Sequence, residues 1–92
     1  MNKINEMKYI AEKFNGYFTN SRKGVPYAVV PFKGKRASVC WFGKGKFFRL
    51  FDNYMPFSDG SNKQNKHDFG DMESVISYLK EQDHAETAKE VQ

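Results

Sequence analysis

Two stretches with helical periodicity flank a central stretch in which hydrophobic and polar residues alternate. The first stretch has apolar residues at helical spacing, namely Ile4, Met7, Ala11 and Phe14. Asn15 and Gly16 follow it, and glycine suits the left-handed backbone that often ends a helix. The pattern therefore predicts a helix over about residues 3–15.

A second helix is predicted near the C-terminus, with a buried stripe of Met72, Val75, Ile76 and Leu79. Asp71 precedes the stripe and suits the N-cap, because its carboxylate can accept hydrogen bonds from free backbone N–H groups. Beyond Gln82 the chain is polar, so residues 83–92 either extend this helix or form a frayed tail, and we favour fraying. A single domain is therefore expected over residues 1–82.

Between the helices the period changes to two, which predicts strands over residues 17–20, 25–32, 37–42 and 46–51. The connecting segments are short, so consecutive strands should pair as antiparallel hairpins in a meander. Residues 52–70 are mostly polar, and residues 58–70 are expected to form a long loop. The predicted fold class is α+β in two layers: an N-terminal helix, a three- to four-stranded antiparallel meander sheet and a C-terminal helix.

The two faces of the predicted sheet follow from the lengths of the turns. With three-residue turns at residues 33–35 and 43–45, one face carries Tyr27, Val29, Ala37, Val39, Trp41, Phe47, Arg49 and Phe51. The other face then carries Ala28, Val30, Phe32, Ser38, Cys40, Phe42, Phe48 and Leu50. We expect the second set to meet the helices, since the first includes a mid-strand arginine and two rings with polar tips. A turn of two or four residues would exchange the faces of the neighbouring strand.

Basic and acidic residues are distributed unequally along the chain. Residues 1–51 hold 11 Lys or Arg against 2 Glu, and residues 52–92 hold 4 Lys against 9 Asp or Glu. Residues 22–49 hold eight Lys or Arg, no acidic residue and six aromatic residues. Positive charge interleaved with aromatic rings is typical of surfaces that bind phosphates and stack on bases. Alternatively, the two oppositely charged halves attract each other within the fold.

We therefore hypothesise a small non-enzymatic module that binds single-stranded DNA or RNA on a basic, aromatic sheet face. The side chains expected to stack on bases are Tyr27, Trp41 and Phe47. Those expected to neutralise phosphates are Lys33, Lys35, Arg36, Lys44, Lys46 and Arg49. The alternative is an interaction or inhibitor protein, of the kind that phages and mobile elements encode. It would use the same patch to cover an acidic or nucleic-acid-binding surface of a larger host protein.

One segment partly resembles the signature of the RNA recognition motif. Residues 44–51 match that signature at Lys44, Gly45, Phe48 and Phe51. They differ from it at Lys46, Phe47 and Arg49. The predicted element order also differs from that of the domain, so the segment indicates no family.

The residue types needed for catalysis or metal binding are sparse. Cys40 is the sole cysteine, which excludes an internal disulfide, is typical of a reducing compartment and suggests a small core residue. His67 and His84 lie in polar segments, so we expect no zinc site, no cofactor and no enzyme. A ribonuclease that works without histidine is the least favoured alternative. With no apolar signal region and no run of about 18 apolar residues, a soluble cytoplasmic protein is expected.

Overall fold

The computed structural model describes residues 2–54 and 64–91, with side chains described as far as Gln82. Its elements, in chain order, are α1 (Lys3–Lys13), β1 (Tyr17–Asn20), β2 (Pro26–Phe32), β3 (Lys35–Phe42), β4 (Phe47–Phe51), β5 (Lys66–Phe69) and α2 (Met72–Val91). The predicted α+β class and the predicted order of helix, strands and helix are confirmed. Within these residues the sheet has five strands rather than three to four.

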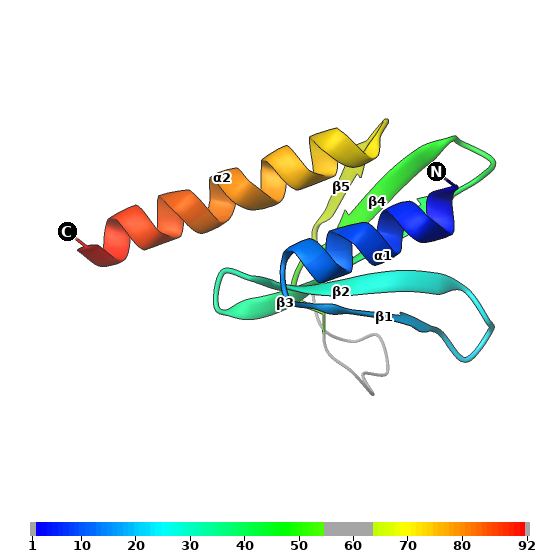
Figure 1. The fold of residues 1–92 in the computed structure, drawn as a ribbon, viewed down its shortest axis with the longest axis horizontal. Coiled ribbons are helices and arrows are strands. Elements are labelled where there is room, and N and C mark those ends of the chain that lie inside the picture. The colour runs from blue at the N-terminus through cyan, green and yellow to red at the C-terminus, as the bar shows by residue number, and fades with distance from the viewer. Residues whose placement is uncertain (1, 55–63, 92) are drawn as a thin grey trace.

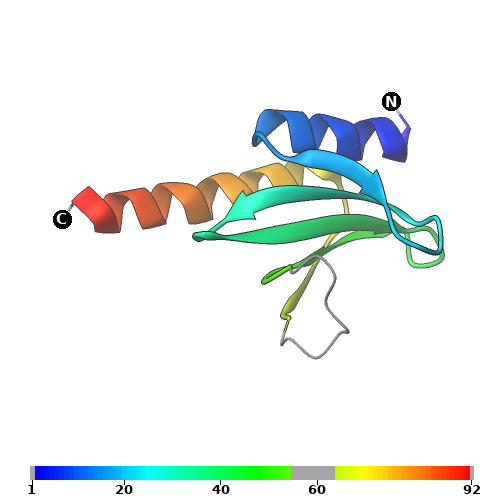
Figure 2. The ribbon, with the colours of Figure 1, turned by 90° about the horizontal axis from the view of Figure 1, so that it is seen from below.

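The strands form one antiparallel sheet in which spatial order follows chain order, from β1 to β5. Both helices cover the same face of the sheet, so the domain has two layers (Figures 1 and 2). The opposite face, which points away from α1 and α2, is called the open face below. The C-terminal half of α2 extends past the sheet (Figure 1).

The hydrophobic core lies between the helices and the sheet. The helices contribute fully buried side chains from Met7, Ile10, Ala11, Val75 and Leu79. The strands contribute Ala28, Val30, Phe32, Ala37, Val39, Phe48 and Leu50. Full burial of one such large apolar side chain stabilises the fold by about 1.5–3 kcal/mol, which explains why most of each predicted stripe points inward. Ile4 of the first stripe is the exception, because its side chain is 44% exposed.

Side chains cap the start of both helices. Asn2 Oδ1 accepts a hydrogen bond from Asn5 N–H at 2.8 Å, and Asp71 Oδ1 accepts one from Ser74 N–H at 2.8 Å. The second cap is the one that the sequence predicts. Hydrogen bonds from the Ser74 side chain, and more weakly from its backbone N–H, lower the pKa of the Asp71 carboxyl.

The turns at both ends of β3 differ in length from those expected. Phe32 pairs with Lys35, so the first turn contains only Lys33 and Gly34. These two residues have positive φ angles of 51° and 75°, the geometry of a type I′ hairpin turn. At the other end Phe42 pairs with Phe47, so the second loop spans the four residues 43–46.

Both changes exchange the faces of β3. Ala37, Val39 and Trp41 lie on the helix-covered face, whereas Ser38, Cys40 and Phe42 lie on the open face. The expected orientation of β3 was therefore wrong. The expected orientation of β2 and β4 was right. Their side chains on the open face are Tyr27, Val29, Phe47, Arg49 and Phe51.

β5 occupies part of the stretch in which a loop was expected. Phe69 packs its ring against Tyr78 of α2, with centroids 5.3 Å apart, and Asp68 lies on the open face opposite Arg49. The rest of the expected loop, residues 58–63, lies outside the described residues. α2 is helical as far as Val91, and neither helix of the described chain is long and apolar enough to cross a membrane.

Gly16 permits a close contact between the end of α1 and β2. A Cβ atom at this position would overlap the backbone oxygen of Val29 and lie 2.9 Å from its carbonyl carbon. The left-handed residue at the end of α1 is Asn15, with a φ of 58°, rather than Gly16. The sequence therefore needs glycine here for space.

Gly16→Ala should lower the free energy of unfolding by about 1–3 kcal/mol, because the added methyl group forces α1 away from β2. Gly70→Ala is the matched control, since a Cβ there meets nothing within 4 Å. Urea denaturation followed by circular dichroism measures both variants. Equal stability of the two variants would contradict the close contact.

Candidate functional site

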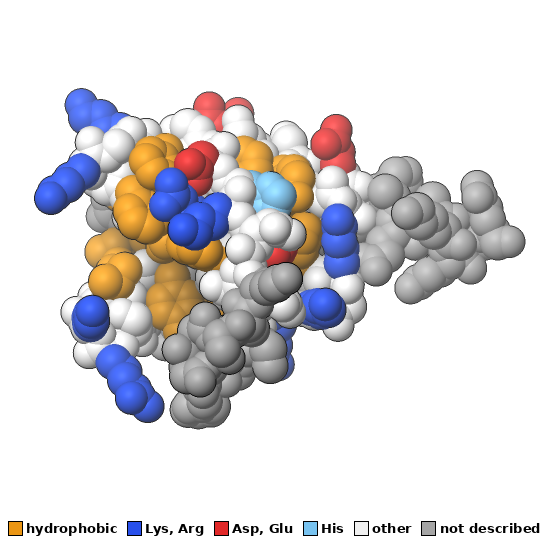
Figure 3. Space-filling model, turned by 180° about the vertical axis from the view of Figure 1, so that it is seen from behind, with side chains coloured by type: hydrophobic (Ala, Val, Ile, Leu, Met, Phe, Trp, Pro, Cys, Tyr) orange, Lys and Arg blue, Asp and Glu red, His pale blue; other side chains and the backbone are white. Residues whose placement is uncertain are grey.

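The open face carries aromatic side chains with basic side chains around them. Figure 3 shows this face, with a basic and an acidic group side by side among the hydrophobic groups and further Lys and Arg toward its margins. The register places Tyr17, Tyr27, Phe42, Phe47 and Phe51 on it. Phe42 and Tyr17 are 38% and 43% exposed, so flat apolar surface is accessible to a partner.

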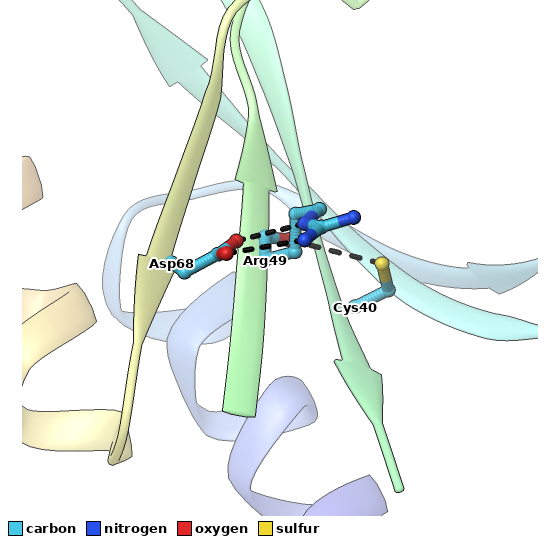
Figure 4. Close-up of polar contacts among 3 residues, drawn as sticks. All are labelled: Cys40, Arg49 and Asp68. Atoms are coloured by element: carbon cyan, nitrogen blue, oxygen red, sulfur yellow. Dashed lines mark hydrogen bonds and ion pairs between the residues drawn. The ribbon is translucent and has the colours of Figure 1, made fainter. Parts of the chain in front are cut away.

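Arg49 and Asp68 form a two-pronged ion pair across β4 and β5. Arg49 Nε donates to Asp68 Oδ1 at 2.7 Å, and Arg49 Nη2 donates to Asp68 Oδ2 at 3.1 Å (Figure 4). These hydrogen bonds hold the pKa of the Asp68 carboxyl below its usual value. The pair therefore stays ionised near neutral pH and has no net charge.

Two phenylalanine rings support the Arg49 guanidinium. Its carbon lies 4.9 Å from the centroid of the Phe42 ring and 5.0 Å from that of the Phe47 ring. The two rings stack on each other, with centroids 5.4 Å apart and planes 17° from parallel. Such contacts between a cation and a ring face are attractive, so Arg49 has partners both beside and beneath its plane.

Tyr54 folds against the open face after β4. Its N–H donates to the Arg36 carbonyl at 2.7 Å, and its hydroxyl lies 3.0 Å from that of Tyr27. Burial and the hydrogen bond between the Tyr54 and Tyr27 hydroxyls raise the pKa of Tyr54. Val29 and Ser38, which oppose each other on this face, are only 1% and 8% exposed. The accessible part of the open face therefore lies closer to the loop of residues 43–46.

Cys40 lies on the open face, beside Arg49, and not in the core as expected. Its Sγ is 3.8 Å from the Arg49 carbonyl oxygen. Burial raises the pKa of the Cys40 thiol to about 11, against a weaker opposing effect of Arg49. The thiol is therefore protonated at neutral pH and unsuited to act as a nucleophile.

Five of the predicted basic residues lie near the two ends of β3. Lys33, Lys35 and Arg36 surround the tight turn, and Lys44 and Lys46 lie in the opposite loop. All five are exposed, and none forms an ion pair with a described carboxylate. Their charges are therefore available to an anionic partner.

Trp41 lies on the helix-covered face, so its expected place on the open face was wrong. Its ring meets that of Phe48 edge to face, with centroids 4.8 Å apart, and Lys3 Nζ lies 4.4 Å from the Trp41 ring centroid. Trp41 therefore belongs to the packing between α1 and the sheet. Phe42, which the sequence analysis did not select, takes its place beside Phe47.

A polar cluster that the sequence analysis missed joins β4 to β5. Asp52 accepts hydrogen bonds from Asn65 N–H at 2.8 Å and Asn65 Nδ2 at 3.3 Å, and it lies 3.4 Å from His67 Nε2. Burial raises the pKa of Asp52, but these hydrogen bonds outweigh it and lower the pKa overall. The His67 ring packs against Tyr78 of α2, with centroids 5.2 Å apart, so the cluster also touches α2.

The part of the chain with described side chains contains no group of three His, Cys, Asp or Glu residues placed to hold a metal ion. The polar groups of the open face instead pair with each other, as Arg49 does with Asp68 and Tyr27 with Tyr54. The arrangement is therefore suited to contact a partner through rings and cations.

Native Cys40 should react with a disulfide reagent at pH 8 about 100-fold more slowly than in unfolded protein. The reason is that a rise in pKa from 9.0 to about 11 reduces the thiolate fraction by that factor. The double variant Cys40→Ala, Ser77→Cys supplies an exposed control thiol on α2. Equal rates for native Cys40 and this control would show that the thiol is not protected.

Asp52→Ala should lower the free energy of unfolding at pH 7 by about 1–2 kcal/mol, because the Asn65 groups lose their acceptor. The native pKa of Asp52 is depressed, so its contribution is present above about pH 4 and is lost as the pH falls through the native pKa. Urea titrations should be made at pH 7 and at an acidic pH below the native pKa of Asp52. The free energies of unfolding of the variant and of the unaltered protein should differ at pH 7 and converge in acid. Glu12→Ala, at an exposed site on α1, is the control. A difference that persists in acid would contradict this role.

Searches against protein-family models, curated proteins and solved structures find no match for this chain.

Proposed function

We propose that the protein binds a single strand of nucleic acid across its open face. The observation that carries the proposal is the position of the two basic loops near opposite ends of β3, with aromatic rings between them. The eight residues of β3 separate these ends by roughly 23 Å at about 3.3 Å per residue. This span suits a short single strand that contacts both loops.

The rings proposed to stack on bases differ in one position from those expected from the sequence. Phe42 and Phe47 supply the stacking surface, together with Tyr27, whereas Trp41 packs under α1. Base–aromatic stacking contributes about 1–3 kcal/mol per base and accepts any base. Binding of this kind needs no enclosed pocket and fits an open sheet surface.

The cations of the two loops supply the phosphate contacts in this proposal. They are Lys33, Arg36, Lys44 and Lys46. Lys35 pairs with Phe32 and lies on the same side of β3 as the buried Ala37, so it is the one predicted loop cation on the helix-covered side. Arg49 makes no such contact, because Asp68 already neutralises it. The proposed activity is binding without catalysis, which the high pKa of the Cys40 thiol supports.

A protein partner is the second candidate. Tyr27, Tyr54, Phe42 and Arg49 belong to types that are enriched in protein interfaces, and here they form two contacting pairs on the same face. A host protein with an acidic or nucleic-acid-binding surface would match the basic loops. Such an interface would depend on salt much less than a nucleic-acid complex.

The affinity for a fluorescently labelled, mixed-sequence single strand of about ten nucleotides should fall steeply with salt. Each neutralised phosphate contributes about −0.7 to the slope of log affinity against log salt, so the double variant Lys44→Gln, Lys46→Gln should flatten the slope by about 1.4. Fluorescence anisotropy at several salt concentrations measures the slope.

The matched control is the double variant Lys8→Gln, Lys13→Gln, which removes two exposed lysines from α1 on the opposite side of the sheet. It should leave the slope unchanged. Equal flattening by both double variants would place binding elsewhere. Failure of the unaltered protein to bind DNA or RNA strands at low salt would overturn the proposal and favour a protein partner.

A further inference from the structure

Four side chains form a row across the open face. In the register, Tyr27 opposes Cys40, Cys40 opposes Arg49, and Arg49 opposes Asp68. The row therefore crosses β2, β3, β4 and β5 in turn. Cys40 has by far the smallest side chain of the four, so the surface is lowest between Tyr27 and Arg49.

The guanidinium of Arg49 has one edge engaged and another edge free. Asp68 takes one hydrogen each from Nε and Nη2. Nη1 and the second hydrogen of Nη2 have no hydrogen-bond partner in the described part of the chain. Figure 4 shows the third nitrogen pointing away from Asp68, on the side where Cys40 lies. Two parallel N–H donors therefore remain free on the edge of the guanidinium that Asp68 does not occupy.

The negative charge of Asp68 beside Arg49 determines which chemical groups the free N–H donors can bind. Asp68 neutralises Arg49, and its own side chain is 48% exposed beside it. A phosphate or carboxylate would meet this nearby negative charge, whereas a neutral pair of acceptors would not. The N7 and O6 atoms of guanine are two such acceptors in one plane, at the spacing that an arginine fork fits.

We propose that the free edge of Arg49 recognises the N7 and O6 atoms of a guanine base that lies over Cys40. This inference rests on the proposed binding of single-stranded nucleic acid and adds a base preference to it. Adenine presents an amino group where guanine has O6, so it would place a donor against a donor. Tyr27 bounds the far side of this subsite, and the exposed ring of Phe42 lies next to it.

Asp68 is a positioning residue in this proposal. It fixes the plane of the guanidinium from the side, while Phe42 and Phe47 support it from its face. A side chain that is already held loses little freedom on binding, which favours recognition by two directed hydrogen bonds. Lysine at position 49 would keep the charge but lack the planar fork.

The test uses labelled ten-residue oligothymidylates that carry one central substitution. The substituted bases are guanine, adenine, inosine and 7-deazaguanine. Guanine and inosine both keep N7 and O6, so both should bind at least about fivefold tighter than adenine. The 7-deaza base lacks N7 and should lose most of this advantage. Anisotropy at one fixed salt concentration gives the four affinities.

Variants separate recognition from general binding. Arg49→Lys should reduce the guanine preference to less than twofold, while Arg22→Lys, in the turn between β1 and β2, should leave it intact. Asp68→Asn should also reduce the preference, but it should raise affinity for all four strands and steepen their salt dependence by about 0.7, because Arg49 becomes an uncompensated cation. A purely structural role for Asp68 would not produce that steepening.

Cys40 supplies a steric test. Cys40→Ala should leave the preference unchanged, whereas Cys40→Leu should fill the low part of the row and abolish it. Circular dichroism and urea titration confirm that each variant is folded before its affinities are compared. Retention of the preference in a folded Cys40→Leu variant would overturn the placement of the base.

The outcomes distinguish the two proposals. No binding of any strand overturns the proposed function and this inference with it. Binding of all four strands with equal affinity supports the proposed function and overturns the inference. A guanine preference that survives both the 7-deaza base and Arg49→Lys overturns the role of Arg49.

Discussion

The register of β3 is the constraint on which the rest of this structure depends. Side chains alternate along a strand, so a shift by one residue exchanges its two faces. The type I′ turn at Lys33 and Gly34 fixes the pairing of β3 with β2, and Ala37 and Val39 become fully buried under the helices. In the other register Ser38 and Cys40 would enter the core in their place.

The same register also builds the candidate site. It places Phe42 beside Phe47, sets Cys40 next to Arg49, and directs Trp41 toward α1. The lengths of the turns therefore determine both which residues of β3 enter the core and which lie on the open face. A change that alters the turn would affect stability and binding together, whereas changes to Phe42 or Arg49 affect mainly the open face.

Much of the fold follows from periodicity in the sequence, including both helices, the first four strands and the Asp71 cap. The faces of β3 could not be predicted, because its two alternating sets have similar apolar character: Ala37, Val39 and Trp41 against Ser38, Cys40 and Phe42. β5 was missed because one large apolar residue among four gives no clear alternation. The pairings of Arg49 with Asp68 and of Asp52 with His67 depend on that strand, so they were missed with it.

The agreement between chain order and strand order affects how the domain can assemble. Each strand of the described sheet pairs only with its neighbours in sequence, so most contacts close short loops at small entropic cost. The connection from β4 to β5 is the longest between paired strands, at 14 residues. We expect the hairpins of β1–β4 to form early and β5 to dock late. The Arg49–Asp68 pair, and with it the charge balance of the open face, would then be completed only in the last stage of folding.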